Sequence, residues 1–275
     1  MRWLRPLAVT ALCASIAACS TSPTGRSQLL LLSDDQLNQM GQQAFAEYQQ
    51  NIPTAGQASH RYVQCITNAI VDVLPNEQRN LDWQIRVFES EQPNAFALPG
   101  GYMGVNTGML DIATTQDQLA SVVGHEIGHV LARHANERAS TQSATSLGLS
   151  VISSTSGMQT PAGQQLMGVL GLGAEYGIAL PFSRRHESEA DVIGLQLMAQ
   201  AGFDPRESVT LWENMQAASG GGAPPAWMST HPSQGQRIQG LQANMDQALA
   251  TYEQARSSGR TPNCPTPVAP LRGFR

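Results

Sequence analysis

His125, Glu126 and His129 stand in a His-Glu-x-x-His pattern, a spacing suited to holding a metal ion. In an α-helix, side chains four residues apart share one face and lie about 6 Å apart along the axis. Two imidazoles so placed can converge on one ion, and Glu126 can reach a water molecule bound to it. The alternative is that both histidines pack beside a buried seam, which is costly for polar groups without a partner. The pattern therefore favours a metal-assisted reaction.

The residues around this pattern predict the helix that it requires. Thr114 and Asp117 are spaced as in a capping box, which marks the start of a helix. Apolar residues follow at helical spacing, at Leu119, Val122, Val123, Ile127, Val130 and Leu131. We therefore expect both histidines on a helix that has one buried face.

A catalytic zinc ion normally takes three protein ligands, so a third must come from elsewhere in the chain. Four candidates, His186, Glu187, Glu189 and Asp191, stand in a predicted helix from about residue 183 to 201. The face that carries Glu187 is otherwise mostly small and apolar, and holds Ala190, Asp191, Gly194 and Met198. Such a face suits packing against another helix, whereas Glu189 lies on a half-exposed face and His186 points about 100° away from Glu187.

Glu187 is therefore the predicted third ligand. Asp191, one turn further on, is placed to accept the free N–H of a ligand histidine and fix its tautomer. The alternative for both carboxylates is a solvated helix start, where acidic groups interact favourably with the helix dipole.

A related zinc-protease arrangement, the metzincin pattern, is excluded. Its third histidine would stand six residues after His129 and its glycine three residues after His129, but Ala135 and Ala132 occupy these places. His134 lies about 180° around the predicted helix from His125. We expect it outside the metal site, on the surface.

The composition is that of a globular protein with enough material for a sizeable core. Of the 275 residues, 41% are hydrophobic and 13% are charged. This length allows one large domain or two small ones. The formal net charge of −5 argues against nucleic acid as a partner.

The amino-terminus has the pattern of an export signal. Arg2 and Arg5 precede a short apolar run, which ends Ile16-Ala17-Ala18-Cys19 and resembles the bacterial lipobox. We expect residues 1–18 to be a lipoprotein signal peptide and Cys19 to be lipidated, with residues 19–32 as a tether. The resemblance implies an outer-membrane lipoprotein that faces the periplasm of a Gram-negative bacterium, because Ser20 rather than Asp follows Cys19. A generic secretory signal is the alternative.

Two cysteines remain after the signal and the lipidation site. Cys65 and Cys264 could form a disulfide in an oxidising periplasm. The bond would join the Pro-rich tail, residues 259–275, to an early helix across a loop of about 200 residues. Two free thiols are the alternative, and we favour the disulfide.

The remaining pattern predicts an α+β fold that is predominantly helical, with one domain over residues 33–258. Short strands are expected near residues 82–90, 95–98 and 102–106. Helices are expected near residues 33–50, 59–74, 183–201, 204–219 and 233–256. Residues 140–180 are poor in charge and rich in small residues, which suits either a linker or two small-residue helices.

Three motifs in order, HEIGH at 125–129, SRRHESEAD at 183–191 and STHPSQGQR at 229–237, resemble the gluzincin zinc metallopeptidases of the CAAX prenyl protease, HtpX, Oma-type and BepA family. The segments TSPTGRSQL and PNAFALPGGYMGVNTGML look like the periplasmic lipoprotein members, LoiP and YcaL. The resemblance covers about residues 21–245. It implies one zinc ion per chain, endopeptidase activity, and a compact, mostly helical domain with a small sheet beside the site helix.

The resemblance also implies roles for individual residues. His125, His129 and Glu187 would hold the zinc, and Glu126 would be the general base. An edge strand would bind extended substrate through Asn94, Ala95, Phe96, Ala97 and Leu98, as an exposed sheet edge can. An ordinary inner strand is the alternative for this segment.

His231 and Arg237 resemble a late histidine and arginine of the family. The corresponding histidine of periplasmic members can approach the zinc and block it, and either side chain could stabilise an anionic tetrahedral intermediate. The alternatives are a loop histidine before a helix and an arginine in a surface salt bridge.

The motifs predict a zinc endopeptidase, and the resemblance implies that it degrades misfolded or misassembled envelope proteins. A second hypothesis is a periplasmic chaperone or assembly factor whose protease site is gated and mostly latent. A third, a lipid-anchored binding module without metal, fits the motifs least well.

Overall fold

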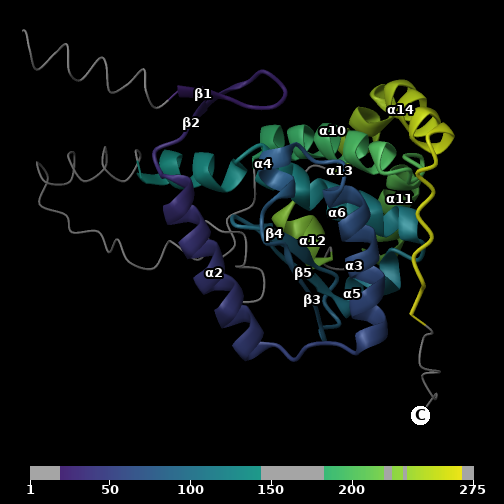
Figure 1. Ribbon diagram of the computed structural model, residues 1–275, viewed down its shortest axis with the longest axis horizontal. Coiled ribbons are helices and arrows are strands. Elements are labelled where there is room, and N and C mark those ends of the chain that lie inside the picture. The colour runs from purple at the N-terminus through teal and green to yellow at the C-terminus, as the bar shows by residue number, and fades with distance from the viewer. Residues whose placement is uncertain (1–18, 144–182, 220–224, 232–233, 268–275) are drawn as a thin grey trace, which may run out of the picture.

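The computed structural model describes residues 19–143, 183–219, 225–231 and 234–267. The predicted signal peptide, most of the stretch at 140–180 and the end of the Pro-rich tail lie outside the described residues. The described chain is mostly helical with two small sheets, which confirms the predicted α+β class (Figure 1). Among these residues, no helix has both the length and the apolar character needed to cross a bilayer.

The helices agree closely with those expected, apart from additional short helices and a break in the long final helix. The long final helix is two helices that meet at Asn244, a short helix precedes the site helix, and another short helix carries the residues before His231. The bounds are α2 Asp34–Asn51, α3 Gln57–Val71, α4 Asn76–Arg79, α5 Thr107–Ile112, α6 Gln116–Leu131, α10 Arg184–Gln200, α11 Glu207–Ser219, α12 Ala226–Thr230, α13 Gln234–Ala243 and α14 Met245–Ser257.

The predicted capping box of α6 is wrong by one residue. Thr115 caps the helix, and its side chain accepts from the backbone N–H of Gln118. The side-chain oxygen of Gln118, Oε1, accepts from the backbone N–H of Thr114 at 2.9 Å. Asp117 instead accepts from the backbone N–H of Asp204 at 2.7 Å. Tertiary contact with the start of another helix therefore determines the role of Asp117.

A three-stranded sheet lies beside α6 and has the order β3-β5-β4 (Figure 1). Its strands are β3 Gln84–Phe88, β4 Ala95–Leu98 and β5 Tyr102–Asn106. β3 pairs with β5 in parallel, and β4 pairs with β5 antiparallel, Ala95 opposite Val105. Within the described residues, β4 is therefore an edge strand and not an inner one.

The helices α6 and α10 pack closely because small residues line their contact. A Cβ atom built on Gly124 would lie 2.8 Å from the Gly194 carbonyl oxygen, and one on Gly128 would lie 2.9 Å from that of Ala190. No larger side chain fits at either glycine without moving backbone. This close approach brings the Glu187 face of α10 to the histidines of α6.

Residues 19–32, the predicted tether, are folded against the domain. Strands β1 Cys19–Thr21 and β2 Ser27–Leu29 form an antiparallel hairpin. The buried Gln28 amide donates to the carbonyl oxygen of Ala132 at 2.6 Å, and the Leu31 N–H donates to Ser140 Oγ at 2.7 Å. The segment therefore packs directly on the chain that follows α6.

Cys65 and Cys264, the two cysteines expected to pair, are joined by a disulfide with Cα atoms 5.7 Å apart. Cys264 is buried, and its backbone N–H donates to the side chain of Gln116 at 2.9 Å. The first part of the predicted tail is thus fastened to the beginning of α6 and to α3.

Candidate metal centre

Four side chains from three segments converge at one buried point. His125 and His129 come from α6, Glu187 from the first turn of α10, and His231 from the end of α12. One nitrogen or oxygen of each lies within 4.8 Å of the others, and all four side chains are buried. The structure therefore brings together the three predicted ligands and places His231 with them.

The spacing of these atoms fits a single tetrahedral zinc ion. The Nε2 atoms of His125 and His129 are 3.0 Å apart, and His231 Nδ1 is 3.2 Å from both His125 Nε2 and Glu187 Oε1. The Glu187 oxygens lie 3.5 Å from His125 Nε2 and 3.6 Å from His129 Nε2. Tetrahedral zinc with bonds of about 2.0–2.1 Å places its ligand atoms about 3.3 Å apart. Nitrogen and carboxylate donors are also the ligands that zinc prefers.

The protonation of the donors suits a cation. Burial lowers the pKa of His129 well below its usual range, and the neighbouring imidazoles act in the same direction despite Glu187. Burial would raise the pKa of Glu187, but His231, His125 and Arg237 outweigh it and hold that pKa well below the usual range. His129 thus offers a lone pair and Glu187 a negative charge.

Asp191 takes the role predicted for it beside His125. Its Oδ1 atom lies 3.0 Å from His125 Nδ1, on the side of the ring opposite the donor atom Nε2. A carboxylate there accepts the Nδ1–H and leaves Nε2 free to bind metal. Burial would raise the pKa of Asp191, but the charge of Arg237 outweighs it and lowers that pKa.

Arg237 lies next to the metal donors and donates hydrogen bonds to the carboxylates of Glu187 and Asp191. Its Nη1 donates to Glu187 Oε2 at 2.6 Å and its Nε to Asp191 Oδ2 at 2.7 Å. The guanidinium is buried and lies over the Trp212 ring at 4.4 Å. The alternative of a surface salt bridge is excluded. Because its donors are used in this way, Arg237 orients Glu187 and Asp191.

Glu126 lies beside the cluster and is held by the segment that carries His231. The indole N–H of Trp227 donates to Glu126 Oε1 at 2.6 Å, and His231 Nε2 is 3.5 Å from the same oxygen. With His231 as a fourth donor, tetrahedral zinc would have no position left for water. The arrangement is therefore that of a covered site.

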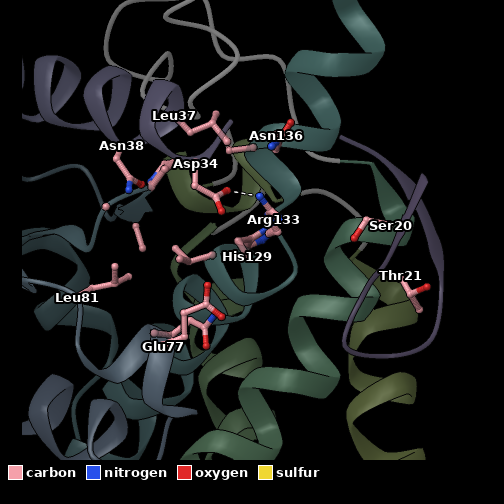
Figure 2. Close-up of a pocket in the computed structure, with 16 residues that line it drawn as sticks. Ser20, Thr21, Asp34, Leu37, Asn38, Glu77, Leu81, His129, Arg133 and Asn136 are labelled. Atoms are coloured by element: carbon pink, nitrogen blue, oxygen red, sulfur yellow. Dashed lines mark hydrogen bonds and ion pairs between the residues drawn. The ribbon is translucent and has the colours of Figure 1, made fainter. Parts of the chain in front are cut away.

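A cleft of about 380 Å³ opens beside His129 (Figure 2). Its walls include Leu37 and Asn38 of α2, Ala97 of β4 and Pro99 after it. In Figure 2 an ion pair between Asp34 and Arg133 crosses one side of this cleft. The predicted substrate strand therefore borders a cavity that reaches a metal ligand.

The side chains of the predicted substrate strand point mostly inward. Asn94, Ala95, Phe96 and Leu98 are buried, and Phe96 packs in a cluster of aromatic rings with Tyr48, whose ring centroid is 4.8 Å away. Only Ala97 is half-buried. What the edge can offer a partner is therefore backbone N–H and C=O groups.

Trp227 at the site was not predicted, and the expected exposure of His134 and Glu189 was wrong. His134 is fully buried, with Nδ1 2.9 Å from His129 Nδ1. The prediction extended the helix too far, because α6 ends at Leu131 and Arg133 has a positive φ of 53° that turns the chain back. No glycine marks this turn. Glu189 is buried rather than half-exposed, and Trp227 had no motif of its own.

This arrangement is that of a zinc metallopeptidase, with a His-Glu-x-x-His helix, a glutamate ligand from a second helix and an edge strand beside them. The chain belongs to peptidase family M48, because the model of that family matches residues 57–245. Peptidases of this family use zinc, and the four donors described above fit that metal.

Individual relatives include proteins of mitochondria and of bacteria. The chain is 37% identical to the mitochondrial metalloendopeptidase OMA1 of Schizosaccharomyces pombe, over 70% of this chain and 55% of the relative. It is 35% identical to OMA1 of Bos taurus, over 91% of this chain and 48% of the relative. It is 28% identical to the metalloprotease LoiP of Escherichia coli, over 79% of this chain and 84% of the relative. The chain thus spans about half the length of these OMA1 proteins.

Proposed function

We propose that this protein is a zinc-dependent endopeptidase that acts on unfolded or misassembled proteins. The observation that carries the proposal is the convergence of His125, His129 and Glu187 at one buried point with Glu126 beside them. Zinc, when bound, supplies Lewis-acid polarisation of a scissile carbonyl and makes water acidic enough to lose a proton near neutral pH. Glu126 accepts that proton and later delivers it to the leaving amine.

The edge of β4 supports a role for backbone pairing in substrate binding. An extended peptide can add to an edge strand through main-chain hydrogen bonds. Binding through the backbone demands little of the substrate sequence but requires an extended segment, which folded proteins rarely expose. This favours unfolded chains as substrates.

Metal removal tests the proposal directly. The purified mature protein should contain about one zinc ion per chain and cleave unfolded casein, and a chelator should abolish cleavage that added zinc restores. Buffer exchange without chelator is the control. Cleavage that persists in a chain shown to be free of metal would exclude this mechanism.

We further propose that the protein is an outer-membrane lipoprotein facing the periplasm. Its support is the lipobox-like sequence that ends at Cys19. We propose misassembled outer-membrane proteins as substrates, because one Escherichia coli relative is named the Beta-barrel assembly-enhancing protease. In a Gram-negative host, Cys19→Ala should release the protein from the membrane fraction. Unchanged fractionation would contradict lipid anchoring.

A gated site is the second candidate, and the position of His231 favours it. His231 Nδ1 lies within bonding range of the point that the other three donors share, and α12 also holds Glu126 through Trp227. Activity then depends on the fraction of molecules in which α12 has moved away. A mostly latent protease could serve chiefly as a chaperone or assembly factor.

Replacing His231 distinguishes a gate from a catalytic group. If the site is open about a tenth of the time, His231→Ala should increase casein cleavage about tenfold, because the competing donor is gone. His60→Ala in α3, away from the cluster, is the matched control and should leave the rate unchanged. A rate that falls with zinc content maintained would instead assign His231 to catalysis.

A further inference from the structure

The second zinc-ligand candidate, His129, is supported by a buried chain of side chains that the mechanism does not use. His129 Nδ1 is 2.9 Å from His134 Nδ1, and His134 Nε2 is 3.1 Å from Glu189 Oε2. All three side chains are buried. His134 thus stands where Asp191 stands for His125.

The donor and acceptor at each step follow from the chemistry of imidazole. A histidine that offers Nε2 to a metal carries its proton on Nδ1. The His129 Nδ1–H therefore donates to His134 Nδ1, and the single proton of a neutral His134 is on Nε2, where it donates to Glu189. Only an acceptor at Glu189 completes this order. A carboxylate is such an acceptor, and each ring then has one proton.

The amino-terminal hairpin holds this carboxylate in place. Thr24 Oγ1 donates to Glu189 Oε1 at 2.5 Å, and Arg26 Nε donates to Glu189 Oε2 at 2.9 Å. The remaining nitrogens of Arg26 donate to Glu137, both at 2.6 Å. Both oxygens of Glu189 therefore face hydrogen-bond donors, which is the arrangement expected of a carboxylate acceptor.

We propose that His134 and Glu189 are positioning residues for the zinc ligand His129, and that the loop of the β1–β2 hairpin, through Thr24 and Arg26, fixes Glu189. The inference rests on the proposed zinc site. It makes the segment just after Cys19 part of the metal centre, although Arg26 and Glu189 are 163 residues apart in sequence. Partners of this kind orient the ligand ring and raise its basicity, and their loss typically weakens metal binding about 10- to 100-fold.

Zinc affinity of the purified mature protein, measured by competition with a chelator of known affinity, is the main readout. Glu189→Gln should weaken zinc binding about tenfold or more, because one amide oxygen replaces two carboxylate oxygens that accept from three side chains. Arg26→Gln should weaken it in the same direction. Glu137→Gln is the matched control, since it removes a partner of Arg26 but leaves the contacts of Glu189, and it should bind zinc as the unmodified protein does.

A double variant separates positioning from a general loss of structure. His134→Phe keeps a ring but cannot pass on the hydrogen bond, and it should also weaken zinc binding about 10- to 100-fold. Adding Glu189→Gln to it should weaken binding no further, because Glu189 acts through His134. The melting temperature of each metal-free variant is measured alongside to show that it is folded. If His134→Phe does not fold, the zinc affinities of Glu189→Gln and Glu137→Gln are compared instead.

The outcomes keep the two proposals apart. An unmodified protein that binds no zinc contradicts the proposed function. An unmodified protein that binds zinc, with Glu189→Gln unchanged or with additive losses in the double variant, contradicts only the positioning role.

Discussion

Glu126→Gln should lower peptide cleavage by about 10²- to 10⁴-fold while zinc binding stays unchanged, because the substitution removes the general base and none of the metal donors. Glutamine has nearly the shape of glutamate, and its carbonyl oxygen can still accept from the Trp227 indole at the position of Oε1. The fold around α12 should therefore persist. Casein cleavage and zinc content are measured on the same preparation.

The Glu126→Gln experiment needs a control in which another glutamate is changed to glutamine and the general base Glu126 is kept. Glu213→Gln on α11 is one, since its carboxylate is not part of the metal cluster. It should cleave casein at the rate of the unmodified protein. A Glu126→Gln protein that retains a tenth or more of that rate would show that another group accepts the proton.

Glu187→Gln should weaken zinc binding more than about 100-fold, because it removes a metal ligand. Loss of a residue that only hydrogen-bonds to a ligand typically costs about 10- to 100-fold. It also removes the charge that pairs with Arg237. His231 is within reach of the same point, so three imidazoles could still retain some zinc. The double variant with His231→Ala should therefore bind zinc more weakly than either single variant. Chelator competition measures all three.

Asp191→Asn is the matched control for this second prediction. It removes the other carboxylate of Arg237 but leaves every cluster donor in place. We expect a loss of about 10- to 100-fold, smaller than that of Glu187→Gln. If the two losses were equal, Glu187 would act only as a partner of Arg237 and another residue would be the third ligand.

Local patterns were sufficient for the core of this site. The spacing of His125 and His129 and the small residues around Glu187 depend only on the geometry of single helices. Ala190 and Gly194 indicated a helix face that packs closely, and the structure places α6 against it. The edge position of β4 required the order of the sheet, which no strand pattern reveals.

The amino-acid sequence by itself determined the site helix, the nature of its metal donors and the α+β class, because helical periodicity and ligand chemistry are properties of short segments. Tertiary structure alone decided the rest. His134 returns to His129 through an unmarked turn at Arg133, and the hairpin reaches Glu189 across most of the chain. Trp227 meets Glu126 for the same reason. These contacts depend on where distant segments pack, and residue spacing carries no information about that.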